Sequence, residues 1–153
     1  MHIEHNQQLE VHNLISFRKL VTPQELNEFG DKMLSYVESQ GAKKVSGGIS
    51  ATYAMEAEKL DIAVYIPINR EVPSNDEFTF KTKLLLTNCL KVSYRGQPYG
   101  MEEALIKINE YIVINKLNAN SVAFIKTINE MENSMDIETF AVDIYVSINA
   151  NVL

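Results

Sequence analysis

The chain has 153 residues, 46% of them hydrophobic and 22% charged, and its formal net charge is −6. This length and composition are those of one globular domain, residues 1–153, that buries a core without disulfides or metals. The negative net charge and the absence of a cluster of Lys and Arg argue against nucleic-acid binding. The sequence has no apolar run long enough for a membrane helix, so we expect a soluble cytoplasmic protein.

The N-terminal residues contain neither the basic start nor the apolar stretch of a signal peptide. All three histidines, His2, His5 and His12, lie there, and we expect a frayed terminus rather than a metal site. Without a histidine elsewhere, a Ser–His or Cys–His nucleophilic site has no base. Cys89 is expected to be a buried thiol. The sequence therefore predicts no cofactor, no metal and no catalytic residue.

The first half predicts one helix among three strands. Residues 9–21 read as a strand, and Thr22-Pro23-Gln24-Glu25 then supplies an N-cap hydroxyl, a proline at the first helical position and a capping-box glutamate. Gly41 marks the end of this helix. Residues 49–53 and 61–68 alternate as two further strands. Apolar residues recur along one helix face at Leu26, Phe29, Met33, Tyr36 and Val37.

The second half follows the same order. Residues 69–77 read as a linker, and a long strand is expected over 80–95. A second helix follows Gly100, and two more strands are expected over 121–130 and 138–149. The order is again strand, helix, strand, strand.

The two halves also match residue by residue. Adding 75 to the numbers of the first helix aligns its apolar face with that of the second, and adding 80 aligns residues 64–69 with 144–149. We therefore predict an internal duplication, with repeats at about 9–69 and 79–149. The expected fold is α+β: a duplicated strand–helix–strand–strand module with antiparallel sheets, two main helices and a central cleft.

The last strand of each repeat has one uniformly branched face, which is expected to pack on the helices. The opposite faces carry small and aromatic residues, which suit a groove floored by small residues and walled by tyrosines. The alternative is that these tyrosines only cement the two repeats together. Asp143 could attract a cationic ligand or could be an acid in water at a strand edge. The residues expected to bind the ligand are Tyr53, Tyr65, Phe124, Asp143 and Tyr145.

Several segments resemble a known family. Leu90–Tyr99 runs from a strand through a basic-Gly turn into the acidic helix start at 101–104. Residues 143–148 resemble the family's final strand, and 60–68 resemble the matching strand of its first module. Over residues 9–149 the chain thus resembles the gyrase-inhibitor-like effector-binding domains, which also form the ligand-sensing half of multidrug-responsive transcription activators.

The resemblance implies a pseudo-twofold pair of modules with a central pocket for bulky apolar or cationic compounds, in which Tyr145 matches a pocket tyrosine. The family's pocket glutamate would fall near Phe124 to Lys126, where the chain has no acid. Members that hydrolyse reactive cyclopropane compounds use that glutamate and often tryptophan. This chain has neither.

We therefore expect a stand-alone module that senses or sequesters a small apolar or cationic molecule without catalysis. Because the sequence shows no helix-turn-helix segment, a sensing function would act through another protein. Two alternatives stay open: a protein-interaction or inhibitor module with the same fold, and a hydrolase of reactive cyclopropane compounds.

Overall fold

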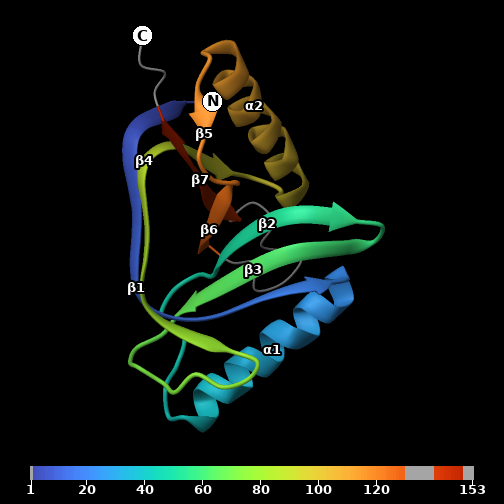
Figure 1. The fold of residues 1–153 in the computed structure, drawn as a ribbon, viewed down its shortest axis with the longest axis vertical. Coiled ribbons are helices and arrows are strands. Elements are labelled where there is room, and N and C mark those ends of the chain that lie inside the picture. Colours follow the sequence, from blue (N-terminus) through green and yellow to red (C-terminus); the bar gives the residue numbers. More distant parts are fainter. Residues whose placement is uncertain (1, 130–139, 150–153) are drawn as a thin grey trace. The chain divides into compact units, whose positions relative to one another are not determined.

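The computed structural model describes residues 2–129 and 140–149 and has an α+β fold with antiparallel strands and two main helices (Figure 1). The chain divides into two compact units. We call Glu10–Leu85 the first unit, and Met1–Leu9 together with Leu86–Leu153 the second unit. The long strands β1 (Ile3–Val21) and β4 (Thr79–Arg95) contribute residues to both. The α+β fold predicted from the sequence is confirmed.

The first unit contains α1 (Pro23–Ser39), β2 (Ile49–Glu56) and β3 (Lys59–Pro67) between the end of β1 and the start of β4. β3 pairs antiparallel with both β1 and β2. The branched face of β3 packs on α1, as expected. The core between them contains Ile15, Phe17, Met33, Val37, Ile66 and Ile68, all buried.

Helix α1 begins and ends where the sequence predicts. The Thr22 hydroxyl accepts a hydrogen bond from the Glu25 N–H (3.2 Å), and the Glu25 carboxylate accepts one from the Thr22 N–H (2.9 Å). These two bonds form a complete capping box. The hydrogen bond from the Thr22 N–H, followed by the Thr22 side chain, lowers the pKa of the Glu25 carboxyl. At the other end Gly41 has φ +74°, the left-handed conformation that glycine adopts without strain.

The second unit contains the short 3₁₀ helix η1 (Pro98–Gly100), α2 (Met101–Ile114), β5 (Asn118–Ala119), β6 (Phe124–Asn129) and β7 (Ala141–Asn149). β7 pairs antiparallel with β4, β5 and β6. Its branched face packs on α2, with Leu90, Ala104, Ile108, Val142, Ile144 and Val146 in the core. Residues 121–123 precede β6, and residues 130, 138 and 139 of the two predicted strands lie outside the described residues.

The strand registers of the two units correspond. In the first unit Ile49 on β2 pairs with Tyr65 on β3, and in the second unit Phe124 on β6 pairs with Tyr145 on β7. The two pairs are related by the offsets found in the sequence, 75 for the first residue and 80 for the second. A bulge interrupts the register after Thr52 in the first unit and, 75 residues later, after Thr127 in the second.

Unusual backbone conformations repeat at the same offset. Asn13 and Asn88 both have positive φ (57° and 51°), and Gly41 corresponds in the same way to Lys116 (74° and 54°). Non-glycine residues seldom adopt positive φ, so chance agreement at two positions is improbable. The repeated order and register are therefore observed within each unit, while a gene duplication as their origin stays a prediction. The single-domain assignment also stays a prediction.

The expected frayed N-terminus is wrong. β1 begins at Ile3. The distance from His5 Nε2 to the Tyr111 hydroxyl oxygen is 2.6 Å, and the two rings pack edge to face. The start of β1 is therefore a strand in contact with α2, although its composition alone is typical of a frayed terminus. Among residues 2–129 and 140–149, no group of His, Cys, Asp and Glu is arranged to hold a metal.

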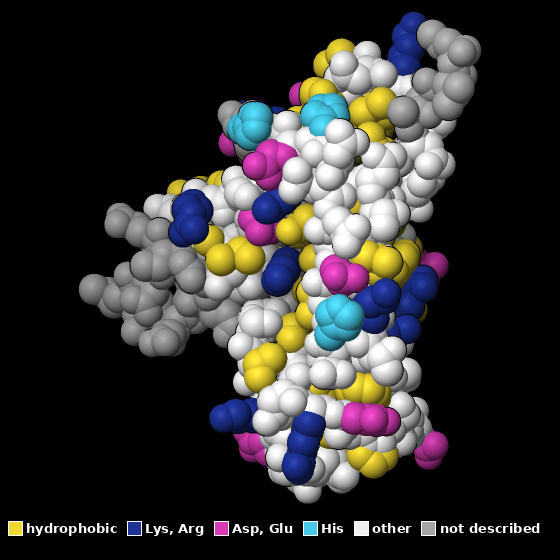
Figure 2. Space-filling view, turned by 90° about the vertical axis from the view of Figure 1, so that its left-hand side faces the viewer, with side chains coloured by type: hydrophobic (Ala, Val, Ile, Leu, Met, Phe, Trp, Pro, Cys, Tyr) yellow, Lys and Arg dark blue, Asp and Glu magenta, His cyan; other side chains and the backbone are white. Residues whose placement is uncertain are grey.

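No helix in the described part of the chain is both long and apolar enough to cross a bilayer. On the face shown in Figure 2, basic and acidic side chains are interspersed.

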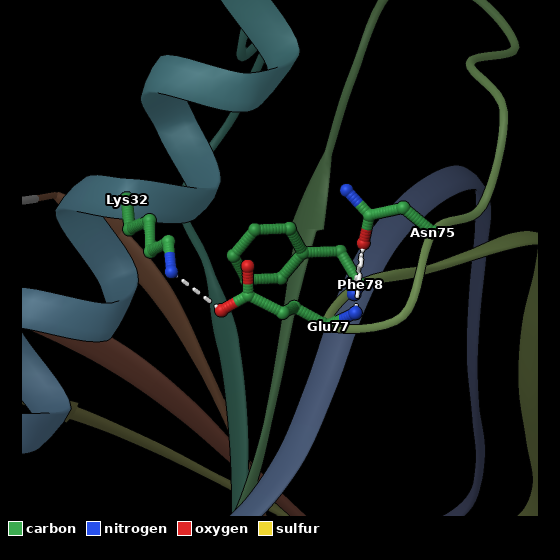
Figure 3. A network of polar contacts seen from close by, with 4 residues as sticks. All are labelled: Lys32, Asn75, Glu77 and Phe78. Carbon is green, nitrogen blue, oxygen red and sulfur yellow. Dashed lines mark hydrogen bonds and ion pairs between the residues drawn. The ribbon is translucent and has the colours of Figure 1, made fainter.

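The predicted linker at 69–77 is packed against the first unit rather than loose. The Asn75 side-chain oxygen accepts hydrogen bonds from the N–H groups of Glu77 (2.9 Å) and Phe78 (2.7 Å), and the Lys32 ammonium of α1 pairs with the Glu77 carboxylate at 2.6 Å (Figure 3). The Phe78 ring, 1% exposed, enters the core beside Phe17. These contacts fix the start of β4, which forms one side of the pocket described below.

Candidate functional site

A pocket of about 300 Å³ lies within the first unit, on the sheet face opposite α1. Ser16 and Ala63, 4% and 2% exposed, form its floor, and Tyr53 and Tyr65 form its walls. Strand pairing brings these residues together, because Ser16 lies directly opposite Tyr65. We call it the Tyr65 pocket. Its lining is Ser16, Phe17, Arg18, Tyr53, Ala63, Tyr65, Thr79 and Lys81.

Arg18 lies over one wall of the Tyr65 pocket. Its guanidinium carbon is 3.8 Å from the centre of the Tyr53 ring, a close cation–π contact. Its Nε and Nη2 donate to the two carboxylate oxygens of Asp61 at 3.1 and 3.0 Å. This pair of bonds raises the pKa of Arg18 and lowers that of Asp61. Tyr53 is the residue that the β2 bulge leaves without a cross-strand partner.

The Tyr65 phenol is partly buried on the other wall. Burial raises its pKa, and the neighbouring Tyr53 phenol raises it further through charge and hydrogen bonding. Tyr65 is therefore neutral at physiological pH. A neutral phenol presents an apolar ring and one polar tip, which is the chemistry of a pocket for an aromatic molecule.

The second unit has a related cluster around Tyr145. Lys91 and Phe124 lie opposite Tyr145 on the two neighbouring strands, and Tyr145 is 7% exposed. The Lys91 ammonium is 5.7 Å from the centre of the Tyr145 ring and 3.7 Å from the Asp143 carboxylate. Glu4 approaches the same ammonium at 3.8 Å. Burial raises the pKa of the Tyr145 phenol, while Lys91 opposes that rise.

Asp143 is engaged by groups of its own chain. Besides Lys91, the Ser93 hydroxyl donates to its carboxylate at 2.7 Å. A carboxylate that already faces one cation and one hydroxyl attracts a second cation less strongly than an unpaired one. The Asp143 carboxylate is therefore already paired within the chain, and its binding of a cationic ligand stays a prediction.

The two clusters differ at equivalent positions of the strand register. Ser16 lies opposite Tyr65 where the second unit has Lys91 opposite Tyr145, and Ala63 stands where the second unit has Asp143. In the second unit a lysine side chain therefore covers the tyrosine ring. In the first unit two short side chains occupy those positions and leave the Tyr65 pocket.

Tyr53 and Tyr65 thus share one pocket, and Phe124, Asp143 and Tyr145 are neighbours on β6 and β7. Ligand binding by all five residues stays a prediction, as does a cleft shared by the repeats. Sequence reasoning missed the cations that accompany the tyrosines, which are Arg18, Lys81 and Lys91. The period-two alternation along β1 and β4 places these residues on the tyrosine face and could have indicated them.

No protein-family model matches the sequence, and no curated protein matches it. Solved structures do match. The C-terminal domain of EcmrR is 12% identical, with a TM-score of 0.72 over 99% of this chain and 100% of that one. The chain shares its fold. EcmrR in its complex with DNA is 14% identical to this chain, with a TM-score of 0.77. The match covers 97% of this chain and 58% of EcmrR, so the chain spans little more than half of that protein's length.

Two further neighbours have lower scores. SAV2435, described bound to tetraphenylphosphonium, is 11% identical with a TM-score of 0.60, over 97% of this chain and 94% of its own. A protein of Listeria innocua described as a hydrolase is 6% identical with a TM-score of 0.59, over 97% and 91%. The α+β fold expected from the resemblance to gyrase-inhibitor-like effector-binding domains is therefore confirmed, while the pseudo-twofold pair of modules and the central pocket stay predictions.

Proposed function

We propose that the protein is a small-molecule-binding module that senses or sequesters its ligand without catalysis. The Tyr65 pocket is the observation that carries this proposal. Its volume of about 300 Å³ lies at the lower end of the range of small-molecule sites. Aromatic walls and a small-residue floor suit a planar aromatic molecule, which can pack against the Tyr65 ring beside Ser16 and Ala63.

Of the two ligand chemistries expected from the sequence, the pocket supports an apolar aromatic compound better than a cation. The Tyr53 ring already holds the Arg18 guanidinium, and the Tyr145 ring already faces the Lys91 ammonium. A cationic ligand at either ring would have to displace a side chain of the protein. SAV2435 is described with a cation, so tetraphenylphosphonium belongs in any ligand panel.

The proposal of no catalysis rests on the carboxylates beside the tyrosines. Asp61 is held by two hydrogen bonds from Arg18, and Asp143 by Ser93 and Lys91. A general base needs a basic oxygen within reach of the substrate, whereas Arg18 lowers the pKa of Asp61. Loss of a cyclopropane substrate's signal on incubation with the protein would contradict this and support the hydrolase alternative.

A thermal-shift panel tests the binding proposal. Neutral naphthalene and biphenyl alcohols, tetraphenylphosphonium and a sugar as negative control are added at increasing concentration. A ligand at 100 times its Kd raises the free energy of unfolding by about 2.7 kcal/mol. Saturable stabilisation by an aromatic compound but not by the sugar supports the proposal. Absence of any shift across the panel contradicts it.

A second candidate function, protein recognition, is favoured by one feature of α2. Ile106, Val113 and Ile114 are 51, 76 and 75% exposed and border a shallow hollow of about 350 Å³ with Asn109 and Glu110. Exposed apolar patches often mark interaction surfaces. Light scattering tests self-association through this surface: a dimer that Val113→Glu converts to a monomer supports it, and a monomer at high concentration opposes it.

A further inference from the structure

We infer that the ligand of the Tyr65 pocket carries an acidic group, so that its chemical class is the aromatic carboxylates. This inference rests on the proposed function and adds the charge of the ligand. It follows from three features of the first unit: the cations that line the pocket, the hydrogen-bond donors they present, and the comparison with the Tyr145 cluster.

The charged groups of the pocket are cationic. Arg18 and Lys81 line it, and among the described residues no acidic side chain does. The Arg18 charge is balanced by Asp61, but Lys81 forms no ion pair within residues 2–129 and 140–149. The pocket thus has a local positive charge on a chain whose net charge is −6. An anion is favoured there, and a cation is repelled.

The polar atoms at the rim are predominantly donors. A guanidinium has five N–H groups, and Asp61 engages two of those of Arg18. The Lys81 ammonium has three, and burial, which raises the pKa of Tyr65, keeps that phenol neutral. A carboxylate accepts several hydrogen bonds at once, and bonds from charged donors are about twice as strong as neutral ones.

In the Tyr145 cluster, side chains of the protein itself supply both the cation and the carboxylate beside the tyrosine ring. There a lysine ammonium lies between a tyrosine ring and a carboxylate, which are Lys91, Tyr145 and Asp143. At the position of Asp143, the first unit has Ala63. The first unit therefore has no carboxylate at this position, and Ala63 lines the open pocket there. Its carboxylate Asp61 pairs instead with Arg18, beside the Tyr53 ring. A ligand carboxylate above Ala63 would complete the arrangement.

Three compounds with one ring system and different charge test the inference. They are 2-naphthoate, 2-naphthalenemethanol and trimethyl(2-naphthylmethyl)ammonium, titrated calorimetrically into the full chain at low salt. We expect 2-naphthoate to bind at least fivefold more tightly than the alcohol, and the ammonium compound to bind most weakly. Since exposed charge pairs are weak and charge-assisted hydrogen bonds stronger, Lys81→Gln should weaken naphthoate about three- to tenfold.

Lys43→Gln is the matched control, because Lys43 is an exposed lysine of the same unit that does not line the pocket. It changes the net charge equally and, because it lies outside the pocket lining, should leave naphthoate binding within about twofold of wild type. Equal affinity for naphthoate and the alcohol, or equal losses in the two variants, overturns the carboxylate inference alone. Failure of all three compounds to bind overturns it together with the proposed function.

Discussion

Truncating the two tyrosines that occupy equivalent positions should have different consequences for folding and for binding. Tyr145 is 7% exposed, so Tyr145→Ala removes a buried ring and leaves a cavity. Aromatic-to-alanine changes in cores cost about 3–5 kcal/mol. Tyr65 is only partly buried and borders a pocket that is already open. Its truncation should therefore cost about half as much, roughly 1.5–2.5 kcal/mol on the same scale.

Urea denaturation and thermal denaturation, both followed by circular dichroism, measure the losses in free energy of unfolding and in Tm. At about 2–4 °C per kcal/mol for a chain of this size, Tyr145→Ala should lower Tm by roughly 10 °C and Tyr65→Ala by roughly 5 °C. Binding of 2-naphthalenemethanol should behave in the opposite way, with the larger loss in Tyr65→Ala. This would make Tyr145 chiefly a packing residue and Tyr65 a ligand-binding one.

Each tyrosine-to-phenylalanine variant is the matched control, because it keeps the ring and removes only the hydroxyl. Both should retain most of their stability. A Tyr65→Ala protein that loses as much stability as Tyr145→Ala while binding the alcohol normally would refute the reasoning, since Tyr65 would then be a packing residue as well.

Three further outcomes are expected from the backbone and the charges. Lys116 and Gly41 both have positive φ, which glycine adopts without strain. In urea denaturation, Lys116→Gly should therefore raise the free energy of unfolding by about 0.5–1 kcal/mol, and Gly41→Ala should lower it by about 1 kcal/mol. Changes of the same sign in the two variants would contradict the correspondence of these positions. Thr22→Ala should cost about 1 kcal/mol by removing the cap, and Thr22→Ser much less. Arg18 lowers the pKa of Asp61 below its ordinary 3.8, so the Asp61 carboxylate stabilises the folded state above that pH, and this stabilisation is lost as pH falls through the folded pKa. In urea denaturation from pH 7 to 2.5, Asp61→Asn should remove that part of the pH dependence. An unchanged profile would contradict the pairing of Asp61 with Arg18.

The sequence predicted the helices because their signals are local. A capping box at Thr22 and a closing glycine at Gly41 define α1 without reference to the rest of the chain. The alternation of branched residues defines the buried faces of β3 and β7 in the same way. The offset of 75 residues, read from helix faces alone, also holds for the bulges and positive-φ positions of the backbone.

The electrostatics of the site depend on register, which the sequence does not specify. Arg18 and Asp61 are 43 residues apart, and only the antiparallel pairing of β1 with β3 brings them into a two-bond contact. Similarly, Asp143 reads as an isolated acid until β4 places Lys91 and Ser93 beside it. The strand predicted at 9–21 begins earlier, at Ile3, and the contact of this added part with α2 joins His5 to Tyr111, 106 positions away.

The most direct test of the account is a nuclear magnetic resonance titration of the isotope-labelled chain with 2-naphthalenemethanol. The account requires saturable shifts concentrated at the amides of Ser16 and Ala63 and at the ring resonances of Tyr53 and Tyr65, with one common Kd. Shifts confined to other residues, or none at concentrations where the alcohol stays soluble, would contradict a ligand site in the Tyr65 pocket.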